Sequence, residues 1–191
     1  MKIIFLIILS LLFSLSSVAE TDEKIIIDQV IEAEKTENFC GDEEIDDLEK
    51  SRELSQVLAM PTEEIIVELS CNFFAYQGIL AYIRYQIDQQ GSVSMTQFKI
   101  EKYDAKIGKI KEEKTILGVV LNLNYQDNSI SHLTKYRGLS DIGMFYRYQV
   151  DLENNKLTLI EQRERDESHI KPTQTPEILP LPDQWPLVYA R

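Results

Sequence analysis

Four side chains that could recognise a charged ligand lie close together in the second half of the chain. Two glycines flank the acidic member and permit unusual backbone angles, so a tight loop between two strands could present an Arg–Asp pair. Binding residues often lie on such loops of a rigid β scaffold. An aspartate between glycines also commonly stabilises a turn through side-chain-to-backbone hydrogen bonds, and we favour that architectural interpretation. The four candidates are Tyr136, Arg137, Asp141 and Arg147.

A second group of candidates is a run of carboxylates within an acidic segment, residues 20–53, which contains 14 acidic and 4 basic side chains. The run lacks the alternating ligands and central glycine of a calcium loop. A charged helix face also does not place two carboxyl groups across a cleft, as a glycosidase requires. The segment repels nucleic acid and could attract a basic envelope protein, although we favour a solvated segment without a partner. The run consists of Asp42, Glu43, Glu44, Asp46 and Asp47.

The requirements of the common catalytic sites are not met. Gly138 and Gly143 enclose a serine with the wrong spacing for a hydrolase elbow. A serine or cysteine nucleophile also needs a base, and only His132 and His169 are present. We therefore expect no catalytic residue, no metal site and no cofactor. A cell-envelope hydrolase with an unfamiliar site around His132 or Asp141 is the alternative.

The first 19 residues have the pattern of a secretory signal peptide. Lys2 precedes an apolar run from Ile3 to Leu15, and small residues end at Ala19, where we place the cleavage. The apolar run is shorter than the roughly 20 residues of a membrane-spanning helix. We therefore predict a periplasmic or secreted protein with no membrane span after signal removal.

The chain has two cysteines, Cys40 and Cys71. In the oxidising compartment that an exported protein enters, an even pair usually forms a disulfide. A metal site is disfavoured because the two thiolates lack further ligands. We predict a disulfide that ties the acidic segment to the start of the β-rich part.

Hydrophobic periodicity predicts a mainly β (α+β) fold, an antiparallel sandwich or partly open barrel of about seven strands. Residues 20–60 should form the acidic segment with one or two short helices, and residues 61–165 the antiparallel β domain. Residues 166–191 should form a proline-rich tail that docks on this domain through its terminal apolar cluster around Trp185. The strands are expected at Glu64–Ser70, Ala75–Ile87, Ser92–Lys102, Thr115–Asn124, Ile130–Tyr136, Met144–Asp151 and Lys156–Glu161.

The pattern also makes predictions for the shorter segments and for the last turn. Residues 23–35 suit a short helix but could equally form an edge strand, and Asp42 could cap a second helix. Residues 104–114 are expected to be an exposed connection or a short helix. The last two strands should form a hairpin, because Glu153-Asn154-Asn155 is turn chemistry between two alternating runs.

Three stretches of the sequence resemble the bacterial domain-of-unknown-function family 1176. Glu68 to Gln77 is similar to that family's cysteine-plus-Ala-Tyr signature, Tyr136 to Gly143 to its Arg-Gly-x-Gly-Asp-Cys-Gly loop, and Asp183 to Pro186 to its closing Trp-Pro. The resemblance covers roughly residues 38 to 191. It implies an exported protein that has lost a second disulfide, because Ile142 stands where the family loop carries a cysteine. The family is uncharacterised, so the resemblance implies no reaction.

Together these features favour a non-enzymatic binding module of the cell envelope, of an inhibitor- or immunity-like kind. Its partner would be a basic envelope protein. Alternatives are the hydrolase described above and a structural envelope protein. Tyrosines on the predicted strands could add an exposed contact strip, although such residues more often cover a sheet face. These tyrosines are Tyr76, Tyr82, Tyr85, Tyr136, Tyr146 and Tyr148.

Overall fold

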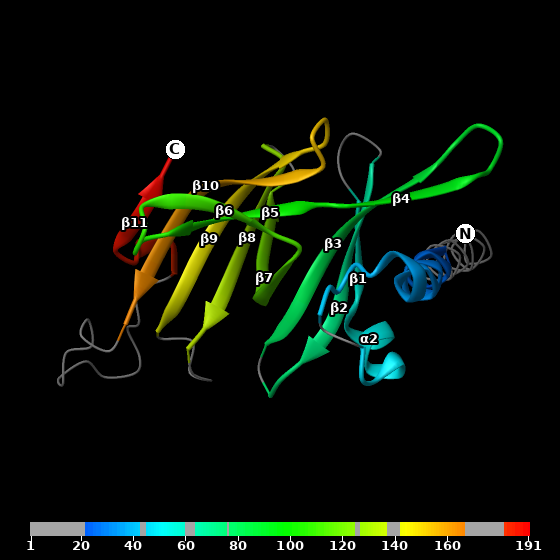
Figure 1. Ribbon diagram of the computed structural model, residues 1–191, viewed down its shortest axis with the longest axis horizontal. Coiled ribbons are helices and arrows are strands. Elements are labelled where there is room, and N and C mark those ends of the chain that lie inside the picture. The colour runs from blue at the N-terminus through cyan, green and yellow to red at the C-terminus, as the bar shows by residue number, and fades with distance from the viewer. Residues whose placement is uncertain are drawn as a thin grey trace, which may run out of the picture.

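The computed structural model describes residues 22–42, 45–59, 64–75, 77–124, 127–136, 142–166 and 182–191. Over these residues the protein is mainly β, and its strands join into one eleven-stranded sheet that is not closed into a barrel (Figure 1). The predicted mainly β, α+β class is therefore confirmed. The helices are the N-terminal helix, described over residues 22–37, α2 (Leu48–Leu54) and the 3-10 helix η3 (Pro182–Gln184). The strands are β1 (Gln56–Ala59), β2 (Ile65–Phe73), β3 (Gly78–Ile87), β4 (Val93–Gln97), β5 (Lys99–Asp104), β6 (Lys109–Glu113), β7 (Thr115–Asn124), β8 (Ser129–Lys135), β9 (Gly143–Asp151), β10 (Lys156–Arg165) and β11 (Leu187–Ala190).

The sheet follows the order β1-β2-β3-β7-β8-β9-β10-β5-β6, with β4 added to β3 and β11 added to β10. All pairs of neighbouring strands are antiparallel except β5 with β10. β4 pairs with β3, and β5 follows after Phe98 and pairs with β10, so one segment crosses from one half of the sheet to the other (Figure 1). The strand predicted over Ser92–Lys102 is thus divided at Phe98.

The inner face of the bent sheet holds the larger core. Alternate side chains of β3, β9 and β10 point inward, as the period of two predicts. The edge of this core is closed by half-buried side chains that include Tyr103 and Tyr189, whose rings stack with centroids 4.9 Å apart. The buried members are Leu58, Ile66, Leu80, Tyr82, Phe98, Ile100, Ile116, Ile130, Tyr146, Tyr148, Val150, Leu157 and Leu159.

A second core lies on the outer face of β2 and β3, where the N-terminal helix packs (Figure 1). The helix buries Ile27, Val30 and Ile31, which share one face because three or four residues make one turn. Against them lie apolar side chains of β2 and β3 such as Val67 and Ile83. Both faces of β2 are therefore covered, one by the inner core and the other by the helix.

The predicted disulfide between Cys40 and Cys71 is present. It joins the segment after the N-terminal helix to β2, at a position where the register with β3 shifts between Ser70 and Asn72. Cys71 is thus the extra residue of a β-bulge, and both cysteines are buried in the second core. The bond fastens the helix to the sheet.

The structure decides one local prediction that had two alternatives and corrects two others. Residues 23–35 form a helix and not an edge strand, because their apolar face packs on β2 and β3. The second helix begins after Asp47, not at Asp42: Asp47 is its N-cap and accepts a hydrogen bond of 2.9 Å from the Lys50 amide. Residues 104–114 are neither a simple connection nor a helix, since β6 pairs with β5 as a hairpin.

The end of the chain lies against the domain. Trp185 is only 1% exposed and packs with Leu133 and Phe145, and β11 pairs with β10. The Trp185 carbonyl oxygen accepts a hydrogen bond of 2.7 Å from the Arg163 guanidinium. Residues 167–181 lie outside the described residues. Across the described part of the chain, no helix has both the length and the apolar character needed to cross a membrane.

Candidate functional site

Two of the four predicted recognition residues, Tyr136 and Arg147, lie in the described part of the chain. Arg137 and Asp141 lie outside the described residues. Arg147 is on β9 and forms an ion pair of 2.8 Å with Glu161, its neighbour on β10. The Tyr136 hydroxyl donates a hydrogen bond of 2.8 Å to Glu164, and partial burial, followed by this carboxylate, raises the tyrosine pKa. Both described residues thus already contact partners within the sheet.

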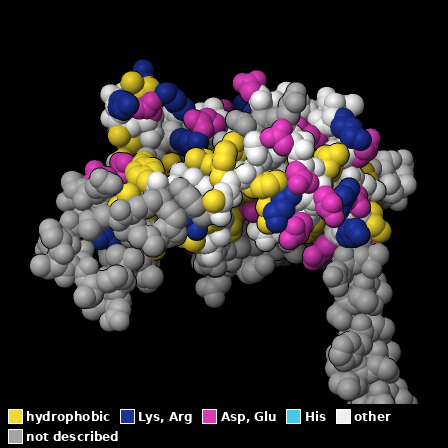
Figure 2. All heavy atoms as spheres, turned by 90° about the horizontal axis from the view of Figure 1, so that it is seen from below, with side chains coloured by type: hydrophobic (Ala, Val, Ile, Leu, Met, Phe, Trp, Pro, Cys, Tyr) yellow, Lys and Arg dark blue, Asp and Glu magenta, His cyan; other side chains and the backbone are white. Residues whose placement is uncertain are grey.

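The acidic run is described only in part, because Glu43 and Glu44 lie outside the described residues. Asp42, Asp46 and Asp47 are exposed, and Asp47 caps α2. Figure 2 shows one face of the molecule, and on its part nearest the N-terminal helix Asp and Glu side chains are mixed with Lys and Arg side chains. Within the described ranges, no three His, Cys, Asp or Glu side chains are placed to share a metal ion.

His132 is buried inside the sheet and is not placed to act on a substrate. It is 1% exposed, and neither imidazole nitrogen has a hydrogen-bond partner among the described residues. Burial, with a smaller contribution from the Lys102 charge, lowers the pKa of His132 to about 3. The imidazole is therefore neutral at pH 7 and enclosed by protein. His169, the other histidine, lies outside the described residues.

The tyrosines do not form an exposed strip. Tyr82, Tyr146 and Tyr148 belong to the inner core, and Tyr85 lies under the N-terminal helix, where its hydroxyl contacts Gln29. Tyr136 is exposed, and Tyr76 lies outside the described residues. The buried tyrosines cover the faces of the sheet, which is the ordinary role of such side chains.

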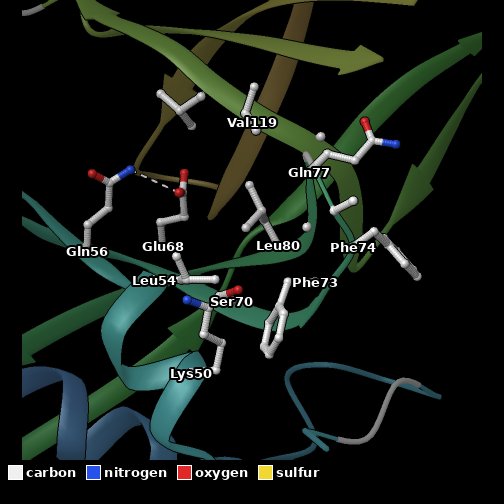
Figure 3. Close-up of a pocket in the computed structure, with 14 residues that line it drawn as sticks. Lys50, Leu54, Gln56, Glu68, Ser70, Phe73, Phe74, Gln77, Leu80 and Val119 are labelled. Atoms are coloured by element: carbon white, nitrogen blue, oxygen red, sulfur yellow. Dashed lines mark hydrogen bonds between the residues drawn. The ribbon is translucent and has the colours of Figure 1, made fainter. Parts of the chain in front are cut away.

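A pocket of about 430 Å³ opens where α2, β2, β3 and β7 meet (Figure 3). Its apolar wall includes Leu54, Phe73 and Leu80, and Gly118 contributes bare backbone from β7. Polar side chains from four segments also line this space. These are Lys50 from α2, Gln56 from β1, Glu68 and Ser70 from β2, and Gln77 next to β3.

Two serines fix α2 over this pocket. The Ser55 hydroxyl accepts a hydrogen bond of 3.0 Å from the Ser70 amide and donates one of 2.7 Å to the Ser51 carbonyl oxygen. The Ser51 hydroxyl in turn donates to the Ser70 carbonyl oxygen. All three serines are buried, so the helix is held to β2 at the bulge. This contact places Lys50 and Leu54 at the pocket.

Glu68 is the most unusual side chain of the pocket, since it is a carboxyl group that is 4% exposed. Its Oε1 accepts a hydrogen bond of 2.9 Å from the Gln56 amide (Figure 3). Its Oε2 accepts one of 2.9 Å from the Tyr82 hydroxyl. Burial raises the pKa of Glu68, and these two hydrogen bonds oppose the shift. No Lys or Arg of the described residues pairs with it. A buried carboxyl group with neutral partners alone is costly to keep ionised.

The sequence analysis missed Glu68 because of the alternation of side chains along β2. Glu68 lies on the opposite face from the apolar Val67 and Leu69, and that face of a strand is usually exposed to solvent. One signal was available: Ile66 lies on the same face as Glu68, so this face is not uniformly polar.

No protein-family model matches this chain, and neither a curated protein nor a solved structure is detectably similar to it. The resemblance to the domain-of-unknown-function family 1176 therefore stays a prediction.

Proposed function

We propose that this protein is an exported, non-enzymatic binding module that holds a ligand in the pocket under α2. The observation that carries the proposal is Glu68, a buried carboxyl group on the pocket wall with neutral partners among the described residues. Polar groups converging in a largely apolar pocket are the usual arrangement of ligand sites. The oxidised Cys40–Cys71 pair is compatible with export after cleavage at Ala19.

Binding is favoured over hydrolysis by the state of the candidate catalytic groups. Cys71 is oxidised, so its sulfur is not a nucleophile, and His132 is enclosed and does not line the pocket. Exposed carboxylates near the N-terminal helix support the further expectation of a basic envelope partner, because their field attracts positive charge over several ångströms. The hydrolase and the structural envelope protein have no comparable observation in their favour.

The proposal can be tested with the neutral dye Nile red and the mature chain, residues 20–191. Saturable fluorescence enhancement at one site is expected. Val120 is half-buried and lines the pocket, so Val120→Trp should fill the space and abolish the enhancement. Leu121, the next residue of β7, is 46% exposed and outside the pocket, and Leu121→Trp is the matched control. No saturable binding, or equal binding by both variants, would overturn the proposal.

A further inference from the structure

We propose that the ligand of this pocket is a primary ammonium group on an apolar arm, and that Glu68 is its counter-ion. This inference rests on the proposed function and adds the chemical class of the ligand. A free amine and the lysine side chain of a protein share this chemistry.

Neither hydrogen-bond partner of Glu68 carries a charge. Gln56 and Tyr82 are neutral donors, and burial keeps the Tyr82 hydroxyl protonated because its pKa is raised well above its usual value. Glu68 therefore has hydrogen bonds without a compensating positive charge. A buried carboxylate normally has a cationic partner, since hydrogen bonds from neutral groups do not replace the hydration that the charge loses.

Lys50, the basic side chain that lines the pocket, does not fill this role. It lines the pocket, but its ammonium group forms an ion pair of 3.0 Å with Glu53 on the exposed side of α2. The side chains of Lys50 and Glu53 are 39% and 67% exposed, so this pair lies at the surface. The counter-charge position at Glu68 is thus open to a ligand.

The carboxyl group of Glu68 has room to accept an ammonium group. Each oxygen of Glu68 already accepts one hydrogen bond, one from Gln56 and the other from Tyr82, and each keeps a further lone pair. An ammonium group is a compact point charge that needs a single remaining lone pair.

The rest of the pocket specifies what carries the ammonium group. Leu54, Phe73 and Leu80 line it, and Phe74, which is 55% exposed, lies at its opening. Figure 3 shows the Glu68 carboxyl group beside Gln56, with Phe73 and Phe74 farther away. A ligand that reaches Glu68 therefore leaves an alkyl or aryl part against these apolar walls. A volume of about 430 Å³ accommodates such a molecule.

Calorimetric titration with three matched probes tests the inference: 4-phenylbutylamine, 4-phenylbutanol and 4-phenylbutyrate. The mature protein should bind the amine at least tenfold more tightly than the alcohol, and the butyrate most weakly. In Glu68→Gln the amine should lose this advantage while the alcohol binds as before. Glu49→Gln removes an exposed carboxylate of α2 and is the matched control, which should keep the preference.

A second measurement does not depend on a variant. Because burial raises the pKa of Glu68, raising the pH ionises it and should strengthen amine binding while leaving alcohol binding unchanged. A peptide with a blocked N-terminus and one unmodified lysine is a further arm: it should also bind, and tighter binding than 4-phenylbutylamine would assign the source to a protein.

The outcomes separate the two proposals. Equal binding of amine and alcohol, or preference for the butyrate, would overturn the ammonium inference, while loss of binding in Val120→Trp would still support a binding pocket. If none of the three probes binds, the ammonium inference fails, and the Nile red titration decides separately whether the pocket binds a ligand.

Discussion

Lowering the pH from 7 to 5 should destabilise this protein, chiefly through His132. Burial lowers the pKa of this imidazole to about 3 in the folded protein. In the unfolded chain the pKa is that of an ordinary histidine, about 6.5. Below pH 6.5 the imidazole therefore binds a proton in the unfolded chain but not in the folded protein. The free energy of unfolding falls as the pH is lowered, until the folded pKa is reached.

The magnitude follows from the two pKa values. One pKa unit corresponds to about 1.4 kcal/mol, and pH 5 lies about 1.5 units below the unfolded pKa. His132 should thus cost about 2 kcal/mol of unfolding free energy between pH 7 and pH 5. This cost is a large fraction of the free energy of unfolding of a typical domain, which is about 5–15 kcal/mol.

Urea denaturation at both pH values, followed by tryptophan fluorescence, measures this effect. His132→Gln has a non-titrating side chain of similar size and is the control, since all other titrating groups cancel in the comparison. The wild type should lose about 2 kcal/mol more than the variant between pH 7 and pH 5. Equal losses in both proteins would show that His132 is accessible to protons in the folded state and would refute the reasoning.

Three further perturbations have predictable costs. Replacing both Cys40 and Cys71 by Ala should cost roughly 3 to 4 kcal/mol in urea denaturation, as expected for a loop of about 30 residues, and should increase hydrogen exchange in the N-terminal helix. Gly118→Ala should cost several-fold more than Gly91→Ala in the same assay: both glycines have positive φ angles, +148° and +81°, but only at Gly118 would the new Cβ lie 2.3 Å from a carbonyl oxygen. Trp185→Ala should cost about 3 to 5 kcal/mol if the buried ring holds the chain end on the domain, and thermal unfolding checks this.

The strands were largely predictable because their signals are local. The hairpin of β9 and β10 follows from alternating side chains on both sides of Glu153-Asn154-Asn155, and the structure confirms it, with Asn155 at a positive φ of 48°. The disulfide was also predictable, because the chain has two cysteines, which allow a single intramolecular pairing, and is predicted to be exported.

The pocket was not predictable because it depends on contacts between distant segments. β2 alternates locally, which predicts one buried face, but the inner core and the N-terminal helix cover both faces. Glu68 therefore looked like a solvent-facing strand residue. Its partner Gln56 lies on β1, a strand of four residues that falls below the length at which periodicity can be recognised. The burial of His132 against Gly118 likewise depends on the pairing of β7 with β8.

The contributions of Glu68 and His132 to the free energy of unfolding should change with pH in opposite directions. Burial raises the pKa of Glu68, so the folded protein holds this proton more tightly than the unfolded chain does. The resulting stability is present below the unfolded pKa and is lost as the pH rises through the folded pKa.

Glu68→Gln keeps an oxygen that can accept from Tyr82 but does not ionise, so its stability relative to the wild type should increase from pH 4 to pH 8. Urea denaturation at these two pH values measures the difference, and the exposed Glu49→Gln should show no such trend. If Glu68 is the counter-ion of an ammonium ligand, 4-phenylbutylamine at pH 8 should stabilise the wild type by mass action more than it stabilises Glu68→Gln. A difference between wild type and Glu68→Gln that stays constant with pH would mean that Glu68 is well solvated, and the charge argument for the ligand would then lose its basis.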